Sequence, residues 1–427
     1  MKYMTFVIMA LLVNFSLFAI EFDKKSRNTK QVTISINSIP TARNAFYPIF
    51  DRFEQETGIE VIPRFINDFN FHSNMDRWLN KGEGQIPDIL FAHSHERLKT
   101  FVEKDAVHSL EPLWQRYNWQ SEYRDELVSG VSFNGERYAV PFAVYTWGLF
   151  YTQSLVEKFG KVPRGWPEFL LYCAKLKQAG MTPFVITHEN PYIAAAWFEY
   201  LVLRMYGLEL FTQIINGKIT YFDSQIQLVF KEWKKVIDMG IFSTDFDGHT
   251  WEQYLPHFLR NEIAFIFSGS PIMSRVYSDD VKSHITFMAF PKIANIKRFE
   301  TAPTDVFFIP ERSENKKYAE IFLAYLLKPQ VQSHLAKYLY TSPANKNSQV
   351  DNFGKLAMSG HEVLISAEGW SPFFDRGTKP AFEKEAVKVF IDFFATTNID
   401  TMTKKLELLR LQHYKPTEVF SAPVTKE

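Results

Sequence analysis

Cysteine is almost absent from this sequence: Cys173 is the only one among 427 residues. No disulfide can form within the chain, so its stability has to come from a large buried core. Cys173 lies in an apolar helical context and is expected to be a small buried side chain. An excess of charge of one sign is also lacking, since 48 basic residues balance 48 acidic ones. This balance argues against a nucleic-acid-binding protein, which needs a basic face.

Several motifs of enzymes and cofactor-binding proteins are missing. The chain has neither a glycine-rich phosphate loop nor a Gly-x-Ser-x-Gly elbow. His93 and His95 form the one close histidine pair, but residues two apart on a helix do not face one another. We therefore expect no metal, no cofactor and no enzymatic activity. A pair of glycosidase carboxylates could still exist among the many acidic residues, so a glycan-degrading enzyme stays open as an unfavoured alternative.

Long hydrophobic runs are lacking after the first residues. Residues 1–19 combine Lys2, an apolar stretch and a terminal Ala19, which predicts a secretory signal peptide. The stretch is shorter than the roughly 20 residues of a membrane span. No cysteine lies near the expected cleavage site, so no lipid anchor is expected there. These features predict a soluble protein exported to the periplasm.

Hydrophobic periodicity predicts alternating strands and helices near the N-terminus. Residues 31–37 alternate as a strand, and residues 41–58 follow as a helix that ends at a glycine. A strand at 59–65, a helix at 71–81, a strand at 87–91 and a helix at 93–103 continue the pattern. This order is typical of a parallel sheet with helices on its faces, where ligands bind beyond the carboxyl ends of the strands.

The segment from Gly135 to Tyr151 predicts a crossover between two halves of the molecule. Two short extended stretches meet near Pro141, which cannot donate to a strand ladder. A second α/β region follows, with helices predicted at 166–180, 194–206, 225–240 and 251–260 and strands at 183–187 and 263–267. Residues 416–427 are expected to form a tail.

The order of these landmarks resembles the sugar-type extracellular solute-binding proteins of ABC importers, the group that includes maltose- and glucose-binding proteins. The resemblance covers nearly the whole chain after the signal peptide. It rests on Phe-Glu-x-Glu-x-Gly-Ile-x-Val at 53–61, Gly-Gln-Ile-Pro-Asp-Ile-Leu-Phe at 84–91, Pro-Arg-Gly-Trp-Pro-Glu-Phe at 163–169 and Asn-Glu-Ile-Ala-Phe-Ile-Phe-Ser-Gly at 261–269. Each motif alone is unspecific, and their common order carries the resemblance.

The resemblance implies an α/β fold of two lobes, each a mainly parallel sheet with flanking helices, which close on a ligand held between them. The N-terminal lobe would comprise residues 30–140 and 275–325. The C-terminal lobe would comprise residues 143–270 and 330–415. The implied function is the capture of a sugar or oligosaccharide and its delivery by a monomeric protein to a membrane ABC permease. A sensor that docks on a membrane receptor kinase is the alternative, and the neighbouring genes would distinguish the two.

The resemblance also suggests which residues contact the sugar. Aromatic rings can pack on the apolar face of a pyranose, and carboxylates can accept hydrogen bonds from its hydroxyls. The candidates are His93, Tyr145, Trp147, Trp197, Glu199, Asp305 and Trp370. For each tryptophan, burial in the core is the competing interpretation. Ser270-Pro271 stands where the family often has a tryptophan, so one stacking surface is expected to be absent.

Overall fold

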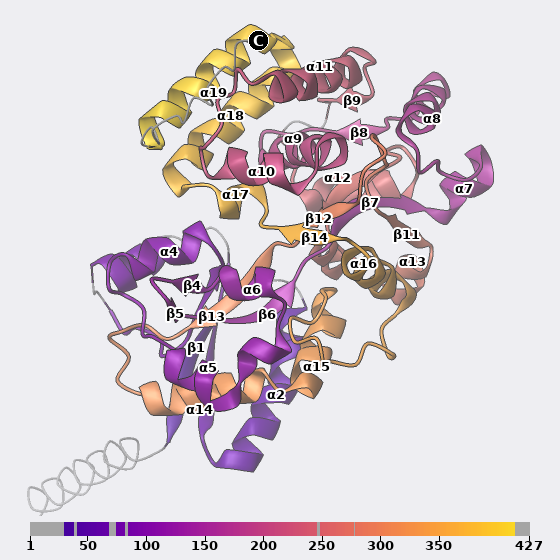
Figure 1. Ribbon diagram of the computed structural model, residues 1–427. Helices are drawn as coiled ribbons and strands as arrows, with labels where there is room; N and C mark the ends of the chain where they lie inside the picture. Colours follow the sequence, from indigo (N-terminus) through magenta and orange to yellow (C-terminus); the bar gives the residue numbers. More distant parts are fainter. Residues whose placement is uncertain are drawn as a thin grey trace, which may run out of the picture.

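The computed structural model describes residues 30–37, 41–67, 74–81, 84–245, 248–276 and 278–414. The expected signal peptide and the expected tail lie outside these residues. Two bodies, joined by strands that run between them, make up the described part (Figure 1). Each body has its own cluster of buried hydrophobic side chains. We call the body around residues 32–144 the first lobe and the body around residues 147–293 the second lobe. The expected α/β fold with two lobes is thus confirmed.

The first lobe is built on one sheet. β1 (Gln31–Asn37) pairs in parallel with β2 (Glu60–Ile66), and a parallel bridge between Ile34 and Ile89 places β3 (Leu90–His93) on its other side. β13 (Thr304–Phe308) returns antiparallel between β3 and β6 (Val140–Val144). α2 (Ala42–Thr57) turns its apolar side chains to the core, and α14 (Lys316–Leu326) and α15 (Pro329–Leu339) belong to the same lobe.

The second lobe repeats this arrangement with shorter strands. β7 (Trp147–Thr152) lies between β10 (Ile266–Gly269) and β11 (Ile285–Met288), and both pairings are antiparallel. β8 (Phe184–Val185) pairs in parallel with β9 (Phe242–Ser243). The helices of this lobe include α8 (Trp166–Gln178), α9 (Tyr192–Met205), α11 (Ser224–Asp238), α18 (Pro380–Thr396) and α19 (Ile399–His413). Each lobe therefore combines parallel and antiparallel pairings, so the expectation of mainly parallel sheets is wrong.

The predicted crossover is present where the sequence placed it. β6 belongs to the first lobe and β7 to the second, so the chain crosses at Tyr145 and Thr146. A bulge in the pairing of β6 with β13 leaves Phe142 without a partner residue next to Pro141, as expected where a proline removes a ladder donor. β12 (Phe299–Thr301) and β14 (Gly369–Ser371) form a parallel pair that lies between the two bodies (Figure 1).

Two segments pack in the other lobe from the one expected. Val276 and residues 285–290 contribute to the core of the second lobe because β11 pairs with β7. Residues 331–344 contribute to the core of the first lobe because α15 packs against α2 and β6. Among the described residues, no helix has both the length and the apolar character that crossing a membrane requires.

Candidate functional site

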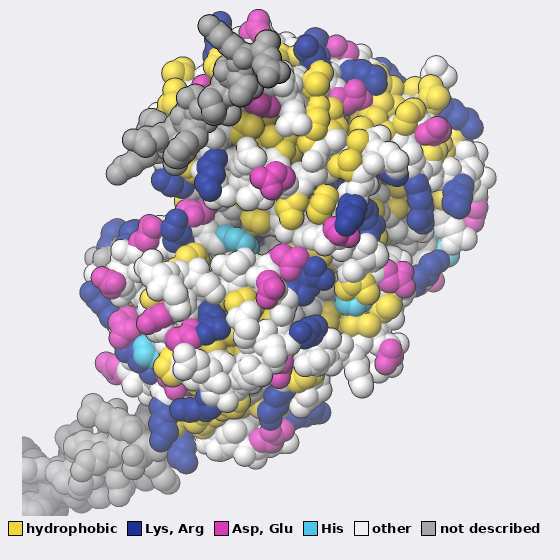
Figure 2. Space-filling model, in the orientation of Figure 1, with side chains coloured by type: hydrophobic (Ala, Val, Ile, Leu, Met, Phe, Trp, Pro, Cys, Tyr) yellow, Lys and Arg dark blue, Asp and Glu magenta, His cyan; other side chains and the backbone are white. Residues whose placement is uncertain are grey.

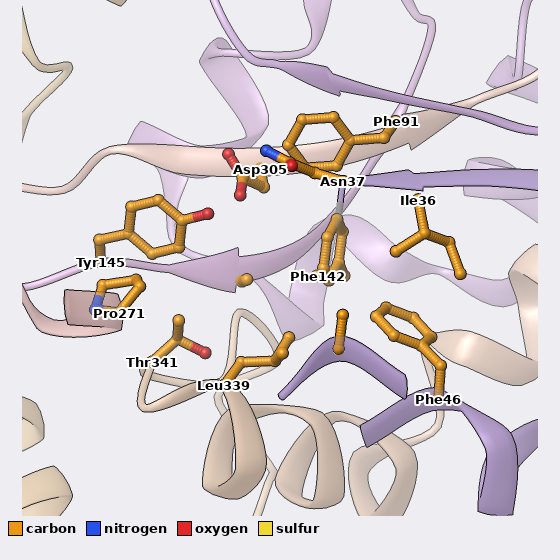
Figure 3. A pocket seen from close by; sticks show the side chains of 12 residues that line it. Ile36, Asn37, Phe46, Phe91, Phe142, Tyr145, Pro271, Asp305, Leu339 and Thr341 are labelled. Atoms are coloured by element: carbon orange, nitrogen blue, oxygen red, sulfur yellow. The ribbon is translucent and has the colours of Figure 1, made fainter. Parts of the chain in front are cut away.

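A cavity lies where the two lobes meet, beyond the carboxyl ends of β1 and β3. It encloses about 360 Å³, part of which is open to solvent. The side chains of Tyr145, Asp305 and Asn37 bring polar groups to the same space (Figure 3). Phe91 and Phe142 lie beside them and, with other apolar side chains, line the rest of the cavity. Pro271 comes from the second lobe, so this cavity is shared by both lobes.

Asp305 is the central carboxylate of this region. It faces His93 across the antiparallel pair of β13 and β3, and His93 Nδ1 lies 2.8 Å from Asp305 Oδ1. The side chain of Asp305 is only 3% exposed, whereas that of His93 is 28% exposed. The structure therefore brings together three of the predicted candidates, His93, Asp305 and Tyr145.

Arg376 joins this group from the second lobe and was not among the predicted residues. It lies on α17 (Phe374–Gly377), and its Nη1 is 3.1 Å from Asp305 Oδ1. Its guanidinium lies over the ring of Tyr145, 5.2 Å from the ring centroid. An arginine six residues after Trp370 carries no pattern of its own in the sequence, because arginines are mostly solvated surface residues. Only the packing of α17 against the first lobe reveals its place.

Trp147 lies at the start of β7, close to the crossover, but it is 5% exposed. One face of its indole stacks on Phe373 with ring centroids 4.5 Å apart and planes at 19°. The ring of Tyr192 meets it edge-on at 6.2 Å. In this arrangement Phe373 occupies one of the two indole faces on which a pyranose could pack. Trp147 stays a candidate only for a state in which Phe373 moves.

Trp197 and Glu199 do not line the cavity. Both are on α9 and are 0% exposed. Trp197 is surrounded by core rings, including those of Phe184 and Phe242 at about 5 Å. Because α9 is buried on every side, its helical pattern could not show which residues face a ligand. The expectation that these two residues contact the ligand is therefore corrected.

Glu199 instead holds α17 in place. Its Oε2 accepts a hydrogen bond from the backbone N–H of Phe374 at 3.0 Å, at the first residue of α17. Burial raises the pKa of Glu199 well above its ordinary value of 4.5, and the neighbouring charge of Asp375 raises it further. Glu199 thus supports the segment that carries Arg376 without touching the cavity.

Trp370 is also a structural residue. It lies on β14, is 7% exposed and belongs to the core of the first lobe. Its Nε1 donates to the backbone oxygen of Leu364 at 2.9 Å, and the guanidinium of Arg124 lies 4.2 Å from its ring. The glycine and proline around it suggested a loop near the ligand, but the segment pairs with β12.

A larger groove adjoins the cavity. It encloses about 1590 Å³ including open solvent, and its lining residues Thr41, Tyr340 and Ser274 are close in sequence to the cavity residues Ala42, Thr341 and Pro271. Both lobes contribute to it, through α2 and α15 on one side and α13 (Asp279–Ser283) and α16 (Lys355–Ile365) on the other. The junction of the lobes therefore has room for a ligand larger than the cavity alone would hold.

The side chains at the junction of the lobes can bind a polar ligand. The described residues contain no group of three or more His, Cys, Asp or Glu side chains placed to hold a metal ion. The cavity combines a carboxylate, a phenol hydroxyl and an amide with aromatic surface. Such a set can hydrogen-bond a polar ligand and pack on its apolar parts. Basic and acidic side chains are interspersed over the face shown in Figure 2.

Comparisons with solved structures support the fold. The bacterial solute receptor AcbH, described as having an exclusive preference for β-D-galactopyranose, aligns with a TM-score of 0.83 and 20% identity over 90% of this chain and 99% of its own. A chitin oligosaccharide binding protein aligns with a TM-score of 0.78 and 17% identity over 90% and 98%. The GacH receptor of Streptomyces glaucescens, solved unliganded and with acarbose, aligns with a TM-score of 0.73 and 17% identity over 90% and 99%.

Sequence comparisons identify the family. Two uncharacterised ABC transporter extracellular-binding proteins of Pyrococcus horikoshii are 21% and 25% identical over 67% and 60% of this chain. The matched regions span 64% and 56% of those relatives' own lengths. The model of the bacterial extracellular solute-binding proteins matches residues 38–333, more than two thirds of the 427 residues. The chain therefore belongs to the bacterial extracellular solute-binding protein family.

Proposed function

We propose that this protein binds a sugar or oligosaccharide between its lobes and delivers it, chemically unchanged, to the membrane permease of an ABC importer. Residues 1–19 would direct its export to the periplasm, where it would act as a monomer. The observation that carries the proposal is the group of polar side chains beside aromatic surface at the junction of the lobes. The solved structures named above, which include a receptor for galactopyranose, support the sugar, and the Pyrococcus relatives support the transporter.

Each part of a sugar has a partner in the cavity. The carboxylate of Asp305 can accept hydroxyl hydrogen bonds, which are stronger because the acceptor is charged. The hydroxyl of Tyr145 and the amide of Asn37 can both donate and accept. The rings of Phe91 and Phe142 offer apolar surface to C–H groups. A ligand held by both lobes would favour the closed arrangement over an open one.

A thermal-shift screen of the purified protein against monosaccharides and oligosaccharides tests this function. A ligand that binds only the folded state adds about 2.7 kcal/mol of stability at a hundredfold excess over its dissociation constant. We expect one class of sugar to raise the unfolding midpoint selectively. Mannitol at the same concentration is the control, because excluded polyols stabilise proteins without a site. Shifts no larger than that of mannitol across the whole panel would refute a sugar-binding role.

A further inference from the structure

Two arginines connect the lobes, one from each side. Arg97 lies on α4 (Glu96–Val102) and donates from Nη2 to Glu383 Oε2 at 2.8 Å and from Nε to the backbone oxygen of Asp375 at 3.0 Å. Arg376 reaches in the opposite direction, from α17 to Asp305. Arg97 thus ties α4 to α18 and α17, and Arg376 ties α17 to β13, so both contacts between the lobes involve α17.

The two arginines differ in how their donors are used. Both bonds of Arg97 have hydrogen-bond geometry, and its side chain is 24% exposed. Arg376 is 8% exposed, and its Nε and Nη1 have no hydrogen-bond acceptor among the described residues. Nη1 is close to Asp305 but does not direct an N–H bond at it. A buried donor without an acceptor lowers stability, so these two donors of Arg376 are held in the interior at a cost.

A matching acceptor lies next to these donors. Asp375 Oδ1 is also buried without a hydrogen-bond partner, and it lies 3.9 Å from Arg376 Nε. This distance is too long for a direct hydrogen bond but shorter than two hydrogen bonds of roughly 2.8 Å in series. One oxygen atom placed between them could accept from Nε and donate to Oδ1. A hydroxyl group is the ligand group that does both.

We propose that Arg376 is a specificity-determining residue, which together with Asp375 binds a hydroxyl group of an uncharged ligand. This inference rests on the proposed function and narrows it to neutral sugars. The charge of Arg376 is already balanced by Asp305, and Asp375 adds a second carboxylate nearby. A ligand carboxylate placed here would meet two like charges, which disfavours an acidic sugar. Arg97 has the different role of joining the lobes.

Matched pairs of sugars and variants test the inference. Calorimetry would compare the binding of D-glucose with that of D-glucuronate, and the binding of D-galactose with that of D-galacturonate. Within each pair, the acid carries a carboxylate where the neutral sugar carries a hydroxymethyl group. We expect the protein to bind a neutral member at least about tenfold more tightly than its acid. Arg376→Lys keeps the charge but loses the planar fork, and we expect it to weaken neutral-sugar binding about tenfold or more. Arg410→Lys is the control, because Arg410 hydrogen-bonds Glu407 and Gly217 within the second lobe, and we expect a change below about threefold.

Each other outcome overturns the inference. Tighter binding of an acid than of its neutral partner would contradict the ligand class. Unchanged binding by Arg376→Lys, or an equal loss in Arg410→Lys, would contradict the role of Arg376. Asp375→Asn provides the same test, with an expected loss of about tenfold, in case Arg376→Lys does not fold by circular dichroism. Absence of binding to every sugar would overturn the proposed function as well, which distinguishes the two failures.

Discussion

At the level of single residues, buried charged side chains hold neighbouring segments of this protein in place. Arg204 forms an ion pair with Glu300, with Nη2 2.6 Å from Oε1, and both side chains are at most 4% exposed. This pair ties α9 to β12, next to the strands that run between the lobes. Glu199, five residues earlier on α9, instead accepts a hydrogen bond from the backbone of α17. One helix therefore fixes two of the segments that link the lobes.

Glu199 should make stability fall as the pH rises above the ordinary carboxyl range. Burial raises its folded-state pKa well above 4.5, so the folded state holds a proton that the unfolded state releases. Stability from this proton is complete below pH 4.5 and is lost as the pH rises towards the folded-state pKa. We expect Glu199→Gln to flatten this decline while it keeps the bond to Phe374. Thermal unfolding between about pH 5 and pH 8 measures the difference, and parallel curves for both proteins would disprove the raised pKa.

At the level of helices and strands, the end of one helix is fixed by its contacts with another helix. Tyr414, after the end of α19, donates from its hydroxyl to the backbone oxygen of Ile215 at 3.0 Å and accepts from the N–H of Lys379 at 3.1 Å. Its ring covers Gly217, where an added Cβ atom would lie 2.2 Å from the ring. The C-terminal helix is thereby attached to the end of α10 (Leu208–Ile215).

Gly217→Ala should therefore be more destabilising than a glycine substitution in open space. Gly217 has φ +65°, and Gly58 has φ +66° with no atom within 4 Å of an added Cβ. Gly58→Ala measures the backbone strain alone, which we expect to cost about 1 kcal/mol. Gly217→Ala adds the displacement of Tyr414, and we expect a further 1–3 kcal/mol, roughly the cost of overpacking. Urea unfolding compares the two, and equal losses would show that Tyr414 moves aside freely.

Local patterns account for most elements that the sequence predicted. The alternation at 31–37 and the helical spacing at 41–58 correspond to β1 and α2, and the ends of α8, α11 and α12 (Trp251–Leu259) agree within about two residues. The predicted helix at 93–103 begins later, at Glu96, because His93 continues β3. His93 and Asp305 were identified by resemblance. Arg376 could not be, because its place depends on contacts between residues distant in sequence.

At the level of the whole molecule, the arrangement of the two lobes depends on the contacts between them. Neither Arg97 nor Glu383 lines the cavity, and both side chains are largely buried at 24% and 14% exposure. The structure therefore represents a state in which the lobes touch through charged groups as well as through the strands that join them. A ligand that binds between the lobes either replaces some of these contacts or adds its own contacts to them.

Reversing one charge of this pair should open the molecule. Glu383→Lys places a second cation against Arg97, and we expect the radius of gyration from small-angle X-ray scattering to increase in the absence of sugar. The double variant Arg97→Glu with Glu383→Lys restores opposite charges and should return the radius towards that of the parent protein. An unchanged radius in the single variant would show that the strands alone set the arrangement of the lobes.

The single cysteine has a practical consequence. Cys173 is 0% exposed in α8, and burial raises the pKa of its thiol, so little reactive thiolate forms near neutral pH. A maleimide dye added to the folded protein would leave Cys173 unmodified. Cysteines introduced at exposed positions, one in each lobe, could then carry a donor and an acceptor fluorophore without removal of the native residue. The chain is in this respect a ready scaffold for an optical reporter of its own ligand.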